Sequence, residues 1–209
     1  MKKIFITESA VGNNLSDTNL KKITKIYEGK IKLPKEIPAK QILLCPIGLV
    51  GAGKTTVVKP ISKKLHLLRI SGDEIRHVLR DNGFNYLRTL EIGQLLIKKY
   101  INKKYSVTID SDCIASEVRN FIKKITKEKN LKTFWIHVKP PEKFIINKLK
   151  SFGKTWLFDS GLQAIKVYKR RKPLHKEYLK LIKFDYTFDT SKENLKEQIN
   201  KFINIVKNV

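Results

Sequence analysis

The hydrophobic and polar positions of this chain alternate between short apolar runs and longer segments with helical spacing. The apolar runs predict buried strands at residues 41–45, 67–70, 105–109, 132–138 and 184–189. Apolar residues that recur every three or four positions predict helices at residues 17–28, 55–65, 74–79, 87–103, 115–127, 142–149, 162–183 and 195–206. Strands that alternate with helices predict an α/β fold, with a parallel sheet covered on both faces.

Two prolines fall inside predicted helices. Pro60 lies in the helix at 55–65, and Pro173 lies near the middle of the helix at 162–183. A proline ring removes one helical hydrogen bond and crowds the preceding turn. We therefore expect the helix at 55–65 to kink or to end early at Pro60.

A glycine-rich segment joins the first strand to the following helix. Residues 48–56 read GLVGAGKTT and fit the pattern G-x-x-x-x-G-K-[ST]. At such a junction, backbone N–H groups and the positive helix end can surround phosphate oxygens, and glycines allow the close approach. Lys54 would neutralise the β- and γ-phosphates, and the Thr55 hydroxyl would ligate Mg²⁺. The predicted nucleotide-binding residues are Gly48, Val50, Gly51, Ala52, Gly53, Lys54, Thr55 and Thr56.

An acidic and a basic residue follow the second strand. Ligands of parallel sheets bind outside the carboxyl ends of the strands, where Asp73 and Arg76 stand. A spacing of three places both side chains on one helix face. Asp73 could accept a proton from an attacking hydroxyl or organise Mg²⁺ water, although an Asp here can also simply cap the helix. Arg76 could hold an anionic acceptor through a forked contact.

The third strand ends in a second pair of acids. An apolar run that ends in Asp is the usual second Mg²⁺ element of phosphate-loop enzymes, so we expect Thr55 and Asp110 to form the metal site. Asp112 is more typical of a turn or cap. Arg119 follows on the next helix and could point back to the cleft as a catalytic residue, or it could be solvated.

The segment at residues 151–161 is the expected mobile lid. Lids usually carry arginines that neutralise charge on the phosphoryl group. Here the nearby cations are Lys148, Lys150 and Lys154, followed by Arg170 and Arg171, and the sequence leaves open which group serves the lid. Trp156 could cover a ligand. The four histidines, His66, His77, His137 and His175, are scattered and show no zinc-like spacing.

The charge of the chain is extreme. Its 209 residues contain 44 Lys plus Arg against 19 Asp plus Glu, a net charge of +25. This balance suggests polyanions such as nucleic acid, although only seven of the cations are arginine and the lysines are spread along the chain. A compositional bias would give the same balance.

Several bulk features bear on location. No apolar run approaches the roughly 18 residues of a membrane span, and the N-terminus lacks the features of a signal peptide. Two cysteines make a disulfide framework improbable and favour a reducing, cytoplasmic setting.

We expect an N-terminal arm over residues 1–40, with a short strand at 4–6, and a catalytic domain over residues 41–209.

The glycine-rich segment and the segment after the second strand together resemble the P-loop small kinases. Residues 71–79, SGDEIRHVL, are similar to L-D-G-D-N-[IV]-R-H-G-L of adenylylsulfate kinase. Residues 82–85, NGFN, stand in place of its G-F-S, and residues 92–94, IGQ, resemble its I-G-E. This resemblance implies that Arg76, Phe84 and Arg88 contact adenylylsulfate and that Asp73 lies near its 3′-hydroxyl.

The C-terminal half departs from that family. Residues 110–114, DSDCI, replace its F-I-S-P-[YF]-R, and its E-N-I-R-R run is absent. Asp110 at a strand end followed by Arg119 on a helix resembles the broader group of zeta-toxin-like and polynucleotide-kinase-like ATP-binding kinases, within the AAA-family ATPases. Residues 184–191 are similar to the last strand of that group, whose following turn lies near the adenine.

These observations predict a P-loop NTPase fold with five parallel strands in the order 2-3-1-4-5 and helices on both faces. The predicted activity is ATP- and Mg²⁺-dependent phosphoryl transfer to a hydroxyl of a small, anionic acceptor. Two alternatives remain: a polynucleotide 5′-hydroxyl kinase and a nucleotide-binding module without transfer. The predicted catalytic residues are Lys54, Asp73, Arg76 and Arg119.

Overall fold

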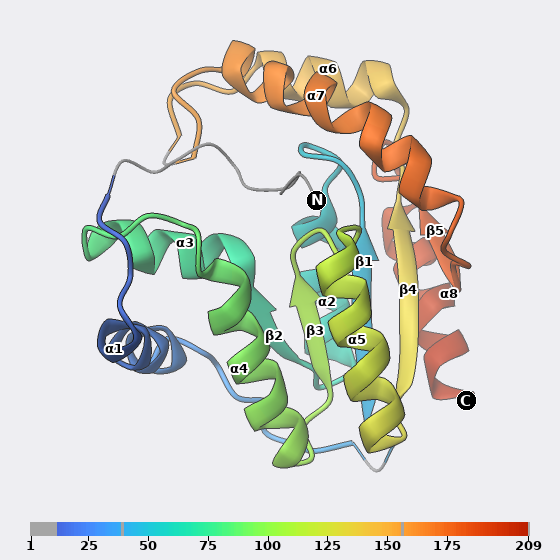
Figure 1. The fold of residues 1–209 in the computed structure, drawn as a ribbon. Helices are drawn as coiled ribbons and strands as arrows, with labels where there is room; N and C mark the ends of the chain where they lie inside the picture. Colours follow the sequence, from blue (N-terminus) through green and yellow to red (C-terminus); the bar gives the residue numbers. More distant parts are fainter. Residues whose placement is uncertain (1–11, 39, 156, 209) are drawn as a thin grey trace.

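The centre of the molecule is a parallel sheet (Figure 1). The structure is a computed structural model, and it describes residues 12–38, 40–155 and 157–208. The strands are β1 (Ile42–Ile47), β2 (Leu68–Ser71), β3 (Val107–Asp110), β4 (Lys132–Val138) and β5 (Tyr186–Phe188). They pair in the order β2-β3-β1-β4-β5, and every pair is parallel. The predicted five-stranded sheet and its strand order are confirmed.

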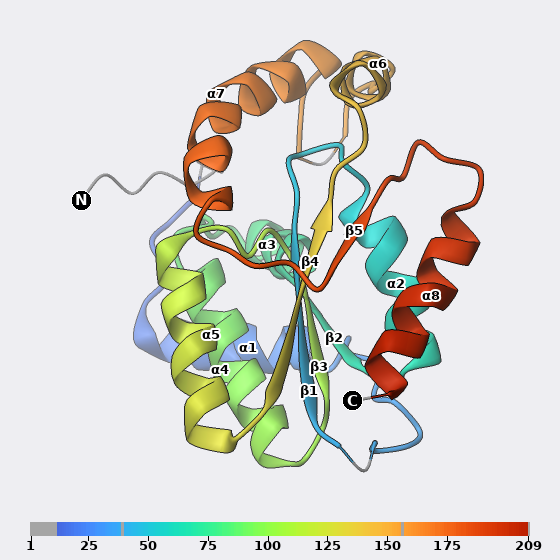
Figure 2. The ribbon, with the colours of Figure 1, turned by 90° about the vertical axis from the view of Figure 1, so that its right-hand side faces the viewer.

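Helices cover both faces of this sheet and one of its ends. They are α1 (Asp17–Glu28), α2 (Lys54–Lys64), α3 (Gly72–Asp81), α4 (Thr89–Asn102), α5 (Ser116–Lys129), α6 (Glu142–Lys150), α7 (Gly161–Leu179) and α8 (Leu195–Lys207). Figure 2 shows α2 and α8 on one face and α1, α4 and α5 on the other. It also shows α6 and α7 crossing above the carboxyl end of β4. These two helices therefore overhang the edge where a ligand is expected.

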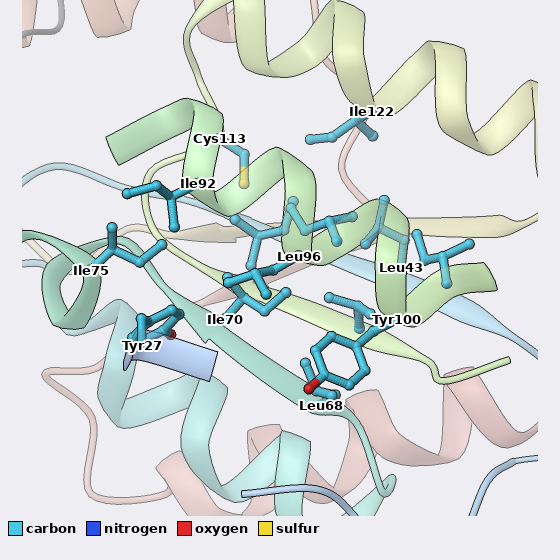
Figure 3. Close-up of a cluster of buried hydrophobic side chains, with 14 of the residues drawn as sticks. Tyr27, Leu43, Leu68, Ile70, Ile75, Ile92, Leu96, Tyr100, Cys113 and Ile122 are labelled. Carbon is cyan, nitrogen blue, oxygen red and sulfur yellow. The ribbon is translucent and has the colours of Figure 1, made fainter. Parts of the chain in front are cut away.

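The alternation of side chains along β1 divides the interior into two cores. Leu43 and Cys45 face the core beneath α1, α3, α4 and α5, whereas Ile42 and Leu44 face the core beneath α2 and α8. Figure 3 shows the first of these clusters, in which Tyr27 and Leu96 meet the strands. All of β1 is buried because helices cover both sides of a central parallel strand. The apolar run that predicted this strand is thereby explained.

Two boundaries differ from the sequence predictions. Helix α2 runs through Pro60 to Lys64, so an early end at this proline was wrong. Val57, Val58 and Ile61 are buried on both sides of the proline, and this packing offsets one missing helical hydrogen bond. The last strand is shorter than predicted because only Tyr186–Phe188 pairs with β4. The predicted strand at 4–6 and Trp156 lie outside the described residues.

The segment before the sheet is fixed to the side of the first core. Helix α1 packs against α3 and α4, and Tyr27 is 1% exposed. The Ser71 backbone N–H donates to the Tyr27 hydroxyl at 2.8 Å. Ser71 is also the N-cap of α3, the helix that carries Asp73 and Arg76. A contact from the N-terminal arm therefore supports the start of α3.

Replacing Tyr27 with phenylalanine should lower stability. The change leaves the buried Ser71 N–H without its acceptor, which costs about 1–3 kcal/mol of unfolding free energy. Tyr105→Phe is the matched control, because the Tyr105 ring packs edge-on against Tyr100 and is only partly buried. Urea denaturation of both variants measures the difference. Equal losses in the two variants would contradict a specific role of the Tyr27 hydroxyl.

A half-buried histidine should make stability depend on pH. His137 on β4 stacks on Phe184 with ring centroids 4.6 Å apart. Burial lowers the pKa of His137 to about 4, and the charges of Lys139 and His175 add to this lowering. The unfolded chain, with an ordinary histidine pKa near 6.5, binds more protons between these two values. Stability should therefore fall as the pH drops from 6.5 to 4.

The loss over this range should be about 1–2 kcal/mol after allowance for solvent screening of the ring. His137→Phe keeps a stacked ring but cannot titrate, so its melting temperature should depend less on pH between 6.5 and 4. Parallel pH series of both proteins measure the difference. Identical slopes would show that other groups cause the pH dependence.

Candidate active site

The turn between β1 and α2 has the backbone geometry that its glycines predict. Gly51 and Gly53 have φ angles of 81° and 91°, in the left-handed region that favours glycine. At Gly48 an added Cβ would lie 2.7 Å from the Val138 carbonyl oxygen, so a side chain cannot fit there without displacing backbone. We call residues 48–55 the phosphate loop.

Lys54 folds back across the phosphate loop. Its Nζ donates to the carbonyl oxygens of Gly48 at 2.6 Å and Leu49 at 3.2 Å. These two contacts hold the ammonium group over the loop, beside the Val50 and Thr55 side chains that line the same cavity. An incoming phosphate would take the place of the carbonyl oxygens as the acceptor for this ammonium group.

Thr55 and Asp110 meet as the sequence predicted. The Thr55 hydroxyl donates to Asp110 Oδ1 at 2.9 Å, and the Asp110 side chain is 2% exposed. A hydroxyl and a carboxylate are the hard oxygen ligands that Mg²⁺ prefers, so the pair fits this ion. Among the described residues no group of three or more His, Cys, Asp or Glu side chains forms a protein-only metal cluster. A metal here would therefore need oxygens from the nucleotide or water.

An arginine that the sequence analysis did not single out occupies the other oxygen of this carboxylate. Arg69 Nη1 donates to Asp110 Oδ2 at 2.6 Å, and Nη2 pairs with Glu74. Burial alone would lower the pKa of Arg69, but the hydrogen bonds and charges of Glu74 and Asp110 raise it. The sequence did contain a signal for this contact, because Arg69 is a charged residue within the otherwise apolar run that predicted β2.

A cavity of about 500 Å³ opens next to the phosphate loop. Lys54 and Thr55 line one part of it, and Asp73 and Arg76 on α3 line another. Apolar side chains from α4, α5 and the segment before α7 form much of the remaining wall, among them Leu90, Ile97, Val118, Phe121, Leu157 and Phe158. The cavity therefore joins an end at the phosphate loop to a compartment with apolar walls.

Asp73 and Arg76 form an ion pair at the edge of this cavity. Arg76 Nη1 lies 2.5 Å from Asp73 Oδ1, as their helical spacing allows. The Asp73 side chain is 55% exposed and the Arg76 side chain is 18% exposed. The helix cap is Ser71, whose hydroxyl accepts from the Glu74 N–H. The side chain of Asp73 is therefore not the N-cap of α3.

Arg171 on α7 lines the same cavity. Burial lowers the pKa of Arg171; the charges of Arg76 and Arg170 also lower it, and Asp112 and Asp73 oppose this lowering. Arg171 and Arg76 therefore both contribute a guanidinium group to the lining of this cavity. Of the cations that the sequence offered for the lid, Arg171 lines the described cavity and Lys148, Lys150 and Lys154 do not.

Asp112 lies in the cavity wall, although its sequence context is typical of a turn or cap. Its Oδ1 accepts from the Gly48 N–H at 3.3 Å, and its Oδ2 lies 2.7 Å from His175 Nε2. Burial alone would raise the pKa of Asp112, but the hydrogen bond and charge of His175 and the charge of Lys54 hold it below its usual value. No short sequence pattern could have predicted this contact, because Asp112 and His175 are far apart in the chain.

Arg119 is held by partners of its own, one of which, Tyr178, lines the cavity. Its guanidinium lies over the Tyr178 ring, 4.9 Å from the ring centroid, and it donates to the Ile114 carbonyl oxygen. Arg119 is not among the described residues that line the cavity. Its catalytic role stays a prediction, and that role requires the side chain to leave these contacts.

The two further residues implied by the adenylylsulfate kinase resemblance lie elsewhere. Phe84 packs against the first core, and Arg88 pairs with Asp17 and Glu91 at 2.7 and 2.6 Å. Arg88 therefore ties the N-terminal segment to α4. Of the residues implied by the resemblance, the structure brings Arg76 and Asp73 to the cavity.

Comparison with known proteins gives a match in structure. No protein-family model and no curated protein matches the sequence. The crystal structure of a protein called APE1195 aligns with a TM-score of 0.56 and 19% identity, over 83% of this chain and 99% of that one. The APS kinase CysC of Mycobacterium tuberculosis, in complex with AMPPNP and APS, aligns with a TM-score of 0.51 and 17% identity. That alignment covers 81% of this chain and 99% of CysC. The chain has the P-loop NTPase fold.

In this fold the turn after β5 lies against the phosphate loop. The Thr190 hydroxyl donates to the Ala52 carbonyl oxygen at 2.7 Å, and a Cβ added to Gly53 would contact the Thr190 side chain. The predicted proximity of this turn to the nucleotide end of the site is thus consistent with the described contacts.

Within the described residues, no helix combines the length and apolar character that crossing a membrane requires.

Proposed function

We propose that this chain is an ATP- and Mg²⁺-dependent phosphotransferase that acts on a hydroxyl group of a small, anionic acceptor. The observation that carries the proposal is the shared cavity, in which Lys54 and Thr55 of the phosphate loop face Asp73 and Arg76. Phosphoryl transfer needs little beyond this: both reactants held in line, and positive charge near the moving group.

Each residue has a chemical task in the proposal. The loop amides and Lys54 would bind the triphosphate, and Thr55 and Asp110 would hold Mg²⁺ together with oxygens of the nucleotide or water. The ion would neutralise charge on the β- and γ-phosphates. Arg69 holds the Asp110 carboxylate in place through its contact with Oδ2. Asp73 would accept the proton of the attacking hydroxyl.

The cavity supports an acceptor that has a flat apolar body and an anionic group. Tyr86, Leu90 and Phe121 offer apolar and aromatic surface, and Arg76 and Arg171 supply positive charge from opposite helices. Guanidinium groups bind phosphate- and sulfate-like oxygens through paired donors. Adenylylsulfate belongs to this chemical class. The structural likeness to a kinase solved with APS and AMPPNP supports its inclusion as the first acceptor to test.

A screen with labelled ATP tests the proposed activity. The acceptors are adenylylsulfate, nucleosides, sugars and RNA with a 5′-hydroxyl. We expect Mg²⁺-dependent transfer of label to a small anionic acceptor, with adenylylsulfate as the first candidate. ATP binding without transfer to any of these acceptors would favour a nucleotide-binding module instead.

The charge of +25 favours one further candidate function, a kinase that acts on nucleic-acid ends. Phosphate contacts along a polyanion release counterions, so transfer to RNA would fall steeply with salt, whereas transfer to a small acceptor would fall much less. The salt dependence of turnover separates transfer to RNA from transfer to a small acceptor.

We also propose a cytoplasmic setting, in keeping with the buried thiols of Cys45 and Cys113. We further propose that the chain divides into an arm over residues 1–40 and a kinase domain over residues 41–209.

A further inference from the structure

Helix α7 changes direction over the active site. Figure 2 shows its first part beside α6, above the end of the sheet, and its last part descending toward α5. Pro173 lies inside this helix, and a proline inside a helix is a common cause of such a bend. The last part of α7 therefore has a different set of neighbours from the first part.

Two contacts fix the last part of α7 to the body of the protein. His175 Nε2 lies 2.7 Å from Asp112 Oδ2, and the His175 side chain is 3% exposed. One turn further on, the Tyr178 ring lies beneath the Arg119 guanidinium. Both partners, Asp112 and Arg119, come from the segment that runs from the end of β3 into α5. The anchor therefore lies next to the metal-site residue Asp110.

The anchor is also connected to the phosphate loop. Asp112 contacts His175 through Oδ2 and accepts a hydrogen bond from the Gly48 N–H through Oδ1. Arg171 stands one helical turn before His175, so both side chains lie on the same side of α7. Arg171, Asp112 and Arg76 line the same cavity. Asp112 therefore contacts both the phosphate loop and the helix that carries Arg171.

We propose that His175 is a positioning residue that, through Asp112, holds Arg171 at the acceptor cavity in fixed relation to the phosphate loop. The kinetic consequence rests on the proposed phosphotransferase function, but the structural consequence does not. His175 itself does not line the described cavity, so its effect on turnover has to pass through the side chains that do.

Labelling of a thiol at position 171 tests the structural part without any acceptor. Cys45 and Cys113 are both 0% exposed, so in Arg171→Cys a small maleimide should report on the new thiol. Adding His175→Ala releases the anchor, and the labelling rate should rise about fivefold or more as the end of α7 opens. His175→Gln can still donate to Asp112 and should keep the slow rate. Lys176→Ala, on the exposed side of the same turn, is the matched control and should have no effect.

A double-mutant cycle tests the kinetic part with adenylylsulfate as acceptor. His175→Ala and Arg171→Ala should each lower kcat about 10- to 100-fold, because a displaced guanidinium no longer meets the reacting group. The double variant should be no slower than Arg171→Ala, since His175 acts through that residue. His175→Gln should restore most of kcat, and the KM for ATP should stay unchanged in all of them. Melting temperatures identify any variant that fails to fold, in which case His175→Gln and Asp112→Asn carry the comparison.

The outcomes are distinct. An unchanged labelling rate in His175→Ala would overturn the proposal, and so would losses in kcat that multiply in the double variant. Faster labelling, together with losses that do not multiply, would support it. Absence of turnover in the parent protein would count against the phosphotransferase function, and the labelling rates would then decide the role of His175 alone.

Discussion

Lys54→Ala should lower ATP-dependent phosphoryl transfer by about 1,000-fold or more, because removal of one fixed donor to a developing charge already costs roughly 10²–10³ in kcat. Lys54 also contributes a full positive charge, and its ammonium lies over the phosphate loop, within 2.6 Å of the Gly48 carbonyl oxygen. Steady-state assays with the acceptor identified by the labelled-ATP screen measure the loss. Calorimetry with Mg²⁺ and ATP should show weaker binding as well.

The matched control is Lys63→Ala, an exposed lysine on the same helix. It removes the same charge from α2 but does not touch the cavity, so its turnover should equal that of the parent. A Lys54→Ala protein that kept more than about a tenth of the parent rate would be incompatible with a phosphate-binding role for this residue. Equal losses in both variants would point to net charge rather than position.

Asp73→Asn should remove transfer but spare ATP binding. Loss of a positioned general base typically costs about 10²–10⁴ in rate. The substitution suits this site because the asparagine oxygen can still accept from Arg76, which now lies 2.5 Å from the Asp73 carboxylate. The ion pair becomes a hydrogen bond from a charged guanidinium to a neutral amide oxygen, and the ability to take a proton is lost. Single-turnover rates and ATP affinity, measured on the same preparation, separate the two effects.

A control for this variant is Asp159→Asn, an exposed carboxylate in the segment before α7. Its rate should match the parent rate. If Asp73→Asn transferred phosphate as fast as the parent protein, the base would have to be another acid. A parallel fall in ATP affinity would instead indicate that Asp73 supports the nucleotide site.

Features that depend on neighbouring residues were predictable from the sequence. The phosphate loop is one, because the left-handed angles at Gly51 and Gly53 are a local demand that only certain residues meet easily. The pairing of Asp73 with Arg76 is another, since helical spacing alone brings the side chains together. The buried strand β1 was visible as an apolar run, because helices cover both its sides.

Features that depend on packing between distant elements were not predictable in the same way. The Asp112–His175 pair joins a strand end to α7, and nothing near either residue indicates the other. Arg69 stands in a strand, and only the pairing of β2 with β3 brings it to Asp110. The sequence left open whether Arg119 faces the cleft or is solvated, and only the structure shows that its guanidinium lies over the ring of Tyr178. In each case the partner is selected by how elements that are far apart in the chain pack together.

The sequence by itself determined the α/β class, the turn that can surround a phosphate, and the acid that meets Thr55 at the end of β3. Local backbone geometry and the alternation of apolar runs encode the first two, and the third was indicated by an apolar run that ends in Asp. Only the tertiary structure decided which cation overhangs the cavity, which carboxylates are held by arginine or histidine, and where Tyr27 supports α3. These contacts arise when elements far apart in the chain pack together, and a packing surface has no short sequence pattern of its own.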